Sequence, residues 1–499
     1  MELRNAFLSR LEQVAESHGA DTWLYDIRHD VRLTFLGTAQ LVARWHDAFH
    51  AAGLVPGQRV ALALPNSVGF GVLYLALLTY GATVVPLNPN APSGEVERVA
   101  KKAAVSLLMT QTPPAASATW PVWVVDAANP ARLPSERPRV LRGPARDSVD
   151  GSILLYTSGT TGEPKGVRLD AGRLAYQANT IAAHHRFGPG DLGYQSLPLF
   201  HINGQVVGLL TSLAAGSALA IDDRFHASDF WDVIARLRPT WINAVPAVLG
   251  ILVNGPAPQG DLSGIRFVRS ASAPLPVPVL HTFEERFGLP IVETYGLTEA
   301  ASQVAANPVI GGPRKAGSAG LPIGARLEVV DPDGRRLPPL VDGEVRIQGP
   351  MVVRGYLNHP DRGPFRGGWF YTGDHGHLDR DGYLFLTGRS RELINRGGQK
   401  VSPREVEDVL LLHSAVEQAA VIGIPHAVLG EEVAAYVVAP SARPRLTDEL
   451  TRLAEAHLSA YKRPVRIVIV NQLPVGPTGK IQRLSLKQQV LAGSVGGGS

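Results

Sequence analysis

The 499-residue chain contains no cysteine. This absence excludes disulfide bonds, zinc sites built on cysteine and a cysteine nucleophile. The chain also has no dense block of lysine or arginine, and its formal net charge is only +4, so we expect no nucleic-acid partner. The longest apolar stretches, such as Val72–Leu78, are far shorter than the roughly 20 residues that cross a bilayer, so we expect no membrane partner.

The composition that remains is typical of a globular protein, with 45% hydrophobic residues. At about 100–200 residues per domain, the length predicts several structural units. The first 19 residues have the pattern of an amphipathic helix with acidic residues rather than that of a signal peptide. We therefore expect a cytoplasmic protein. The sequence does not indicate an oligomeric state.

Buried strands alternate with helices along most of the chain. Arg59–Leu64 and Thr83–Pro86 are expected strands, with an expected helix at Ser67–Tyr80 between them. This alternation predicts an α/β fold in which parallel-rich sheets are covered by helices. Later in the chain, turn pairs such as Asp333-Gly334 lie between short alternating runs. They predict antiparallel hairpins, which we expect to form a small β-barrel-like region.

The pattern divides the chain into three segments. Residues 1–390 are expected to form the large N-terminal α/β domain. Residues 391–490 have a separate α+β pattern and are expected to form a small C-terminal domain. Residues 491–499 are rich in glycine and serine and are expected to be a flexible tail.

The segment Tyr156–Val167 reads YTSGTTGEPKGV and follows an expected buried strand. Its glycines let the backbone approach a ligand closely, and its hydroxyls and Lys165 suit a polyphosphate. The spacing is not that of a Walker A loop, because Pro164 stands where that pattern has its second glycine. A flexible surface loop is the alternative for such a string.

This string resembles the phosphate loop of the acyl-CoA synthetase, adenylation-domain and luciferase superfamily. The resemblance continues in order over about residues 30–485. It implies an adenylate-forming enzyme that uses ATP and Mg²⁺ to convert a carboxylic acid to its acyl-AMP, with release of pyrophosphate. The acyl group would then pass to a thiol, that of coenzyme A. The resemblance implies that ATP is bound by Thr157, Ser158, Gly159, Thr160, Thr161, Lys165, Ser272, Ala273, Pro274, Glu293, Thr294, Tyr295, Thr298, Asp374 and Arg389.

Local chemistry agrees with several of these roles. Tyr295 offers a flat ring on which a purine can stack. Thr298 and Glu299 are oxygen ligands of the kind that Mg²⁺ prefers, and Asp374 can accept hydrogen bonds from a ribose diol. Taken alone, Tyr295 is equally consistent with a core aromatic residue. Glu299 could likewise be a solvated acid at a helix start, and Asp374 a turn residue.

Three residues are expected to be catalytic by the same resemblance: Lys480, Arg389 and His201. Lys480, in Pro477-Thr478-Gly479-Lys480, matches the lysine that the family carries on a mobile C-terminal domain. The ordinary pKa of a lysine is about 10.4, so it is expected to be protonated at neutral pH. Arg389 would contact ribose or α-phosphate, and His201 would stand at the gate of the acyl pocket. The alternative for His201 is a structural histidine, and the alternative for Arg389 and Lys480 is a surface charge.

The sequence ELINRGGQKVSPREVE resembles the oxalyl-CoA synthetase-like acid–CoA ligases most closely. Two positions depart from that subgroup, because Asn203 and Ser302 stand where the subgroup tends to have histidines. Their imidazoles could bind a second carboxylate, so oxalate itself is disfavoured and the acid is left open. The expected substrate pocket comprises His201, Asn203, Val245, Ser270, Ala271, Gly296, Ala301 and Ser302.

Two other readings of the function stay open at this point. The acceptor could be a carrier-protein thiol, an amine or another nucleophile instead of coenzyme A. The chain could also be a nucleotide-binding protein without catalysis, although Lys480, Glu299 and the complete phosphate loop argue against that reading. The segment 397–400 is expected to face the pantetheine tunnel. Coenzyme A phosphates could be bound by Arg396, Lys400, Lys462 and Arg463, with surface charge as the alternative.

Overall fold

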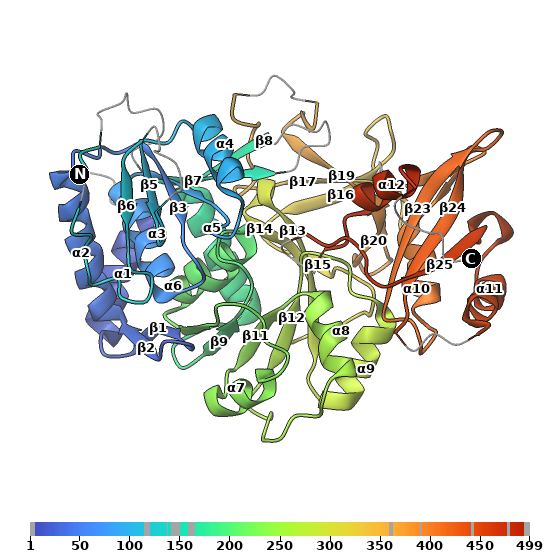
Figure 1. The fold of residues 1–499 in the computed structure, drawn as a ribbon, viewed down its shortest axis with the longest axis horizontal. Coiled ribbons are helices and arrows are strands. Elements are labelled where there is room, and N and C mark those ends of the chain that lie inside the picture. Colours follow the sequence, from blue (N-terminus) through green and yellow to red (C-terminus); the bar gives the residue numbers. More distant parts are fainter. Residues whose placement is uncertain are drawn as a thin grey trace.

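The computed structural model describes residues 5–113, 120–136, 138–140, 150–157, 165–358, 363–389, 392–440, 444–476 and 480–493. Within these ranges the strands form four sheets. Figure 1 shows the N-terminal elements at one end of the molecule and the C-terminal elements at the other. None of the helices in the described ranges combines the length and apolarity of a bilayer-spanning segment.

The first sheet has six strands in the order β6-β5-β3-β4-β7-β8. All neighbours are parallel except the last pair, β7 and β8. Parallel strands are buried on both faces, which explains their almost continuous apolar sequences. The strands are β3 (Arg59–Ala63), β4 (Thr83–Pro86), β5 (Leu107–Thr110), β6 (Val122–Val124), β7 (Ser152–Thr157) and β8 (Lys165–Asp170).

The second sheet has nine strands in the order β15-β14-β13-β12-β11-β9-β10-β1-β2. Strands β1, β10, β9, β11, β12 and β13 are parallel neighbours, and antiparallel strands close both edges. The strands are β1 (Thr22–Asp26), β2 (Val31–Thr34), β9 (Leu192–Gln195), β10 (Ala218–Ile221), β11 (Trp241–Ala244), β12 (Phe267–Ser270), β13 (Ile291–Leu297), β14 (Ser302–Ala306) and β15 (Leu321–Pro322).

Helices cover these two sheets, and their starts follow ordinary capping rules. For example, the Ser67 side chain accepts a hydrogen bond from the Phe70 N–H and begins α3, whose C-cap Gly81 has a positive φ. The helices are α1 (Ala6–His18), α2 (Phe35–Ala51), α3 (Val68–Tyr80), α4 (Ser93–Ala103), α5 (Ala171–His185), the π-helix η1 (Asn203–Leu210), α6 (Thr211–Ala215), α7 (Phe230–Leu237), α8 (Pro246–Asn254), α9 (Val277–Phe287) and the 3₁₀-helix η2 (Thr298–Ala300).

The two faces of the nine-stranded sheet belong to different hydrophobic cores. On β12, Phe267 packs in the larger core, whereas the next residue, Val268, packs in the smaller one. Trp241 and Ile242 of β11 alternate in the same way. Because side chains alternate along a strand, Arg269 on β12 points to the face of Phe267. This alternation brings polar side chains from separate strands together.

An antiparallel sheet of five strands follows, with the order β16-β17-β19-β18 and β20 paired to β19. It occupies the region where the sequence predicts hairpins and a small barrel. The strands are β16 (Arg326–Val330), β17 (Gly343–Gln348), β18 (Phe365–Arg366), β19 (Trp369–Leu378) and β20 (Leu384–Arg389).

We call residues 394–491 the C-terminal unit, which has its own sheet and its own apolar core. It lies at one end of the molecule in Figure 1. The predicted boundary at residue 390 lies outside the described residues and stays a prediction. The elements are β21 (Ile394–Arg396), β22 (Gln399–Val401), α10 (Pro403–Leu410), β23 (Gln418–His426), β24 (Gly430–Val438), α11 (Leu446–His457), the 3₁₀-helix η3 (Ala460–Lys462), β25 (Arg466–Val470) and α12 (Arg483–Leu491).

Candidate active site

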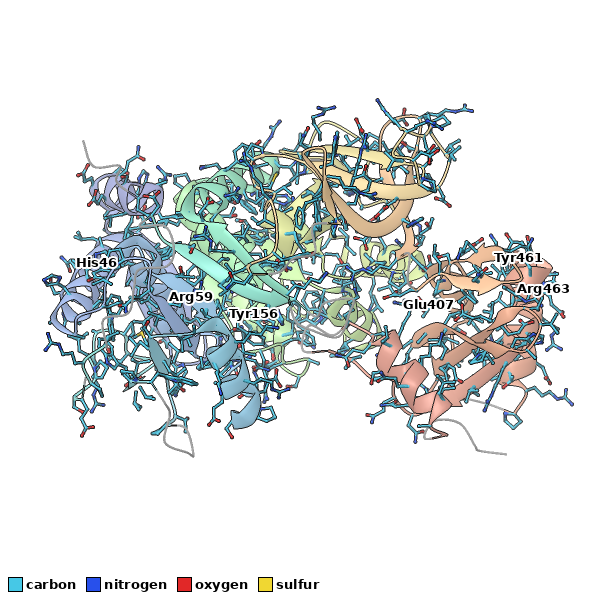
Figure 2. The ribbon with its side chains drawn as sticks, turned by 90° about the horizontal axis from the view of Figure 1, so that it is seen from above. His46, Arg59, Tyr156, Glu407, Tyr461 and Arg463 are labelled. Carbon is cyan, nitrogen blue, oxygen red and sulfur yellow. The ribbon has the colours of Figure 1, made fainter. Side chains whose placement is uncertain are left out.

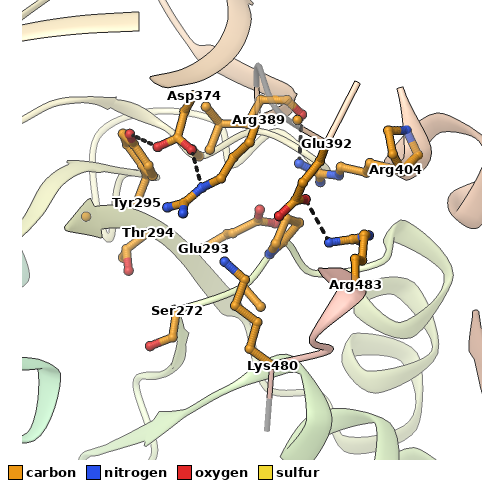
Figure 3. A pocket seen from close by; sticks show the side chains of 17 residues that line it. Ser272, Glu293, Thr294, Tyr295, Asp374, Arg389, Glu392, Arg404, Lys480 and Arg483 are labelled. Atoms are coloured by element: carbon orange, nitrogen blue, oxygen red, sulfur yellow. Dashed lines mark hydrogen bonds and ion pairs between the residues drawn. The ribbon is translucent and has the colours of Figure 1, made fainter. Parts of the chain in front are cut away.

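A cavity of about 110 Å³ lies where β13, β19 and β20 meet the C-terminal unit (Figure 3). Ten of the residues that the sequence predicts for the site line this cavity, although they come from segments far apart in the chain. Its lining is Ser272, Ala273, Pro274, Glu293, Thr294, Tyr295, Gly296, Ala319, Asp374, Leu386, Gly388, Arg389, Glu392, Pro403, Arg404, Lys480 and Arg483.

Tyr295, Asp374 and Arg389 form one hydrogen-bonded group in the cavity wall. The Tyr295 hydroxyl donates to one oxygen of Asp374, and the Arg389 Nε–H donates to the other over 2.9 Å. Asp374 and Arg389 face each other in the register of β19 and β20, where opposite charges attract. Burial and the neighbouring Asp374 carboxylate raise the pKa of Tyr295 well above its ordinary value. Its ring is therefore neutral at physiological pH and suits purine stacking.

Lys480 reaches the same cavity from the C-terminal unit. Two main-chain hydrogen bonds connect the described residues around it, one from the Gly476 N–H to the Lys480 carbonyl and one from the Gln482 N–H to the Pro474 carbonyl. Figure 3 shows its amine directed toward Arg389 and Glu293. Burial and the Arg389 charge lower the pKa of Lys480. An amine in this position can stabilise negative charge that develops in a reaction.

Glu293 is buried in the cavity wall, with only 4% of its surface exposed. Its Oε2 atom has no hydrogen-bond partner among the described residues. Burial raises the pKa of Glu293 to about 7, although the positive charge of Arg404 opposes this shift. At neutral pH this carboxyl group therefore retains a proton far more readily than an ordinary glutamate.

The described part of the phosphate loop lies on β7 and β8. Thr157 and Lys165 are paired in the register of these strands, and Lys165 is almost fully buried. The Lys165 amine lies 4.9 Å from the ring centroid of Tyr356. The Tyr356 hydroxyl in turn donates to Glu299 over 3.0 Å. Of the predicted phosphate-binding residues, Ser158, Gly159, Thr160 and Thr161 lie outside the described residues.

Thr298 and Glu299 follow β13 on the 3₁₀-helix η2. Burial raises the pKa of Glu299, which shows that its charge is poorly solvated in the protein alone. A divalent cation would remove that cost, and a carboxylate with a hydroxyl is an oxygen ligand set that Mg²⁺ accepts. The residues therefore fit the predicted metal.

Of the predicted acyl-pocket residues, Gly296 lines the cavity itself, and Asn203 is hydrogen-bonded to Ser272 in the cavity wall. His201 is largely buried, its Nε2 atom has no partner among the described residues, and burial lowers its pKa to about 4. His201 is therefore a neutral imidazole, not a cation. Asn203 begins η1, and its side-chain amide donates to the Ser272 hydroxyl over 3.3 Å. Asn203 thus connects the pocket to the cavity.

The remaining predicted pocket residues lie at or near the ends of β11, β12, β13 and β14. Val245 stands at the N-cap of α8, and the hydroxyl of buried Ser270 has no partner among the described residues. A Cβ atom at Gly296 would lie 1.7 Å from the Ser302 carbonyl oxygen, so only glycine fits there. Ala271, next to Ser270 in the chain, and Ala301, next to Ser302, are both buried. The contact of these residues with an acid stays a prediction.

Three polar side chains that the sequence did not single out form a row behind Asn203. Gln195, Asn243 and Arg269 lie on the neighbouring strands β9, β11 and β12 and are successive partners in register. The Asn243 side-chain amide donates to the Gln195 side-chain oxygen Oε1 over 2.7 Å. The alternation of each strand could have indicated a polar face, but no single motif contains the row.

Arg269 is the centre of this row. Its Nη1 atom donates to the side-chain oxygens of Asn203 (3.1 Å) and Asn243 (2.9 Å), and its Nε atom donates to Gln303 (2.9 Å). The guanidinium is fully buried, and desolvation lowers its pKa to about 9. No carboxylate of the described residues forms an ion pair with it. We call Gln195, Asn203, Asn243, Arg269 and Gln303 the Arg269 network.

Comparison with known proteins agrees with this geometry. The family described as AMP-binding enzyme matches residues 11–357, and the AMP-binding enzyme C-terminal domain matches residues 405–480. The chain therefore belongs to the AMP-binding enzyme family. Among its relatives is an oxalate–CoA ligase of Arabidopsis thaliana, 37% identical over 90% of this chain and 93% of the relative. Another is a sulfoacetate–CoA ligase of Cupriavidus necator, 38% identical over 91% and 92%.

Solved structures show the same fold. The anthranilate CoA ligase AuaEII in complex with anthranoyl-AMP has a TM-score of 0.88 at 25% identity and covers 99% of each chain. ATP-bound MatB from Rhodopseudomonas palustris has a TM-score of 0.87 at 27% identity, over 98% of this chain and all of that one. The predicted superfamily and fold class are thus confirmed. The chain is an AMP-forming acid–CoA ligase, an enzyme that activates a carboxylic acid with ATP and forms its coenzyme A thioester.

Proposed function

We propose that the acid activated by this ligase is short and carries a second anionic group, which the Arg269 network attracts. The observation that carries the proposal is the buried guanidinium of Arg269, which has amide partners but no carboxylate partner among the described residues. Through Asn203 and Ser272, this cation is connected to the cavity by two hydrogen bonds.

A buried cation without a counter-ion is costly, because neutral amides replace only part of its hydration. The pKa of Arg269 is lowered from its ordinary value because of this desolvation cost. An anion that comes close to the guanidinium gains more there than in water, because the low dielectric of the interior weakens screening. The network is therefore arranged to favour an acid with a negative charge at the end away from the reacting carboxylate.

The relatives named above act on acids of this kind. Oxalate and sulfoacetate each carry a second anionic group close to the carboxylate, and the corresponding ligases are 37% and 38% identical to this chain. The missing imidazoles at Asn203 and Ser302 disfavoured oxalate on sequence grounds. We infer that Arg269 supplies the positive charge at this end of the site instead, so oxalate is again a candidate acid. A sulfonate and a second carboxylate are both compatible with this network.

In the first half-reaction, the acid carboxylate attacks the α-phosphorus of ATP and pyrophosphate leaves. Tyr295 would stack on the adenine, while Asp374 would accept hydrogen bonds from the ribose hydroxyls. Lys480 and Arg389 would stabilise charge on the α-phosphate. Mg²⁺, held by Glu299 and Thr298, would neutralise phosphate charge when bound. These groups contribute positioning and electrostatics, and none acts as a nucleophile.

In the second half-reaction, the thiol of coenzyme A attacks the acyl-adenylate and AMP leaves. We propose that the C-terminal unit rotates about residues near 390 between the two steps, so that Lys480 withdraws. Of the four predicted phosphate partners, Arg396 is paired with Glu432, and Lys462 with Glu405. Arg463 lies on the side of the unit that faces away from the rest of the molecule (Figure 2). Lys400, exposed on β22, is the remaining candidate.

The proposal is tested with a panel of acids in a pyrophosphate-release assay with MgATP, each run with and without coenzyme A. Oxalate, malonate and sulfoacetate represent acids with a second anion, and acetate, propionate and benzoate represent those without one. We expect turnover with the first group, dependent on coenzyme A. Preference for the second group would overturn the proposal. Turnover that coenzyme A does not enhance would point to another acceptor.

A nearly isosteric variant, Gln303→Glu, tests the role of the network itself. It places a carboxylate next to the Arg269 Nε atom and supplies the missing counter-ion. We expect kcat/KM for the preferred dianionic acid to fall by roughly 10- to 100-fold, with KM for ATP unchanged. Gln13→Glu, on the exposed surface of α1, is the matched control. Equal losses for acids with and without a second anion would show that the network is only structural.

A further inference from the structure

Arg404 is a residue of the C-terminal unit that reaches into the rest of the molecule. It lies in the first turn of α10 and is mostly buried. Its Nη1 atom donates to the Leu386 carbonyl oxygen over 2.9 Å, and its Nη2 atom donates to the Gly317 carbonyl oxygen over 3.4 Å. Both carbonyls precede the expected boundary at residue 390. The hydroxyl of Ser402, the N-cap of α10, also donates across this boundary, to the Thr387 carbonyl oxygen.

Two acidic groups flank the Arg404 guanidinium. Asp408, one turn further along α10, lies 3.5 Å from its Nε atom. Glu293, across the boundary on β13, lines the same cavity and is influenced by the Arg404 charge. Arg404 therefore faces an acid from each side of the boundary. Loss of its charge would leave Glu293 and Asp408 close together without a cation between them.

The position of α10 is coupled to that of Lys480. Arg483, three residues after Lys480, donates to both oxygens of Glu407 on α10, over 3.0 and 2.6 Å. Glu407 also accepts a hydrogen bond from the Val421 N–H on β23. Figure 2 shows Glu407 on the side of the C-terminal unit that faces the rest of the molecule. These hydrogen bonds hold Arg483, α10 and β23 together, and Lys480 lies three residues before Arg483.

We propose that Arg404 is a positioning residue that holds the C-terminal unit in the arrangement in which Lys480 reaches the nucleotide cavity. It would therefore support the adenylating half-reaction and contribute little to thioester formation. This inference rests on the rotation between half-reactions proposed above. A guanidinium suits the task because its planar donors bind two carbonyls and an acid at once, which a lysine amine cannot do with the same geometry.

The absence of cysteine allows a direct test of the arrangement. Cysteines introduced at two exposed sites, Val428 in the C-terminal unit and Ile310 outside it, can carry a donor and an acceptor fluorophore. With MgATP, we expect Arg404→Ala to shift the ratio of the two arrangements by about tenfold relative to the unsubstituted protein, because hydrogen bonds from a charged group are lost. Arg404→Lys should shift it less. Arg452→Ala, on the exposed surface of α11, is the control.

The half-reactions are then measured separately, with oxalate or sulfoacetate as the acid and with the corresponding synthetic acyl-adenylate plus coenzyme A. We expect Arg404→Ala to lower kcat for pyrophosphate release about tenfold and to leave thioester formation within about twofold. Equal losses in both steps, or energy transfer identical to that of Arg452→Ala, would overturn the proposal. If the unsubstituted enzyme activates neither acid, the proposed substrate class fails, and the energy-transfer experiment alone decides the role of Arg404.

Discussion

The proposed site has two ends, a nucleotide end around Asp374 and Arg389 and an acid end around the Arg269 network. At the nucleotide end Arg389 is paired with Asp374, whereas at the acid end Arg269 is buried among amides with no carboxylate partner in the described residues. The counter-ion of a paired cation offsets part of its charge and holds its hydrogen-bond donors in a fixed direction. An unpaired buried cation keeps a positive potential and selects for charge. In the function proposed above, arginine contributes a fixed, paired donor at the nucleotide end and charge selectivity at the acid end.

The largest expected effect comes from removing the cation that is brought to the nucleotide end by the C-terminal unit. Lys480→Ala should lower the rate of acyl-AMP formation by about 10²- to 10³-fold, because one preorganised donor to the developing charge is lost. The relative rates for different acids should not change, since the Arg269 network is intact. The measurement is pyrophosphate release, with circular dichroism as a check on folding.

Lys487→Ala provides a matched control for that experiment. Lys487 lies on α12 of the same unit and pairs with Glu431 over 2.7 Å, away from the cavity lining. Near-normal adenylation by Lys480→Ala, or an equal loss in Lys487→Ala, would remove Lys480 from the catalytic group.

The second prediction concerns Glu293, the buried acid between the two parts of the molecule. Its pKa of about 7 in the folded protein exceeds the ordinary value of 4.5, so the folded state binds more protons between these two pH values. Stability therefore falls as pH rises from 4.5 to 7, by about 3 kcal/mol at most. Glu293→Gln removes this loss. Thermal unfolding at pH 5 and pH 8 should show a smaller decrease of Tm for the variant.

Parallel decreases of Tm in the two proteins would show that Glu293 titrates normally. The acid specificity of Glu293→Gln should match that of the unsubstituted enzyme, because Glu293 does not contact the Arg269 network in the described residues. This result would show that Glu293 affects the pH dependence of stability without affecting the choice of acid.

A smaller effect is expected when the ion pair of the nucleotide end is broken. Asp374→Asn keeps an acceptor for the Tyr295 hydroxyl but leaves Arg389 without its counter-ion. We expect KM for ATP to rise about tenfold, because a hydrogen-bonding carboxylate for ribose is lost. Discrimination between acids should stay constant. A changed acid preference with constant KM for ATP would contradict the assignment of the two ends.

Much of the nucleotide end could be predicted from the sequence because its residues occur in short contiguous strings. Tyr295, Asp374, Arg389 and Lys480 were each singled out within such a string, and the structure brings all four to one cavity. A short contiguous motif specifies a local backbone conformation and the functional groups on it, so these groups can be recognised without knowing the rest of the fold. The roles of these residues stay predictions until the variants are measured.

Arg269 and Arg404 could not be predicted in the same way. Arg269 lies in a strand whose pattern indicates only burial, and its hydrogen-bond partners come from β11, β14 and η1. Arg404 lies in a charged helix that reads as a solvated surface. The roles inferred for Arg269 and Arg404 depend on their neighbours in the folded structure, and the local sequence pattern does not specify those neighbours.

The sequence by itself determined the family, the α/β class and the chemistry of the nucleotide strings, because strand periodicity and turn composition are local properties of the chain. The tertiary structure alone decided that a row of amides surrounds an unpaired cation and that α10 connects Arg404 with Lys480. Parallel pairing joins strands separated by long crossovers, so the neighbours of a buried side chain are set by the register of the sheet and not by the residues beside it in the chain.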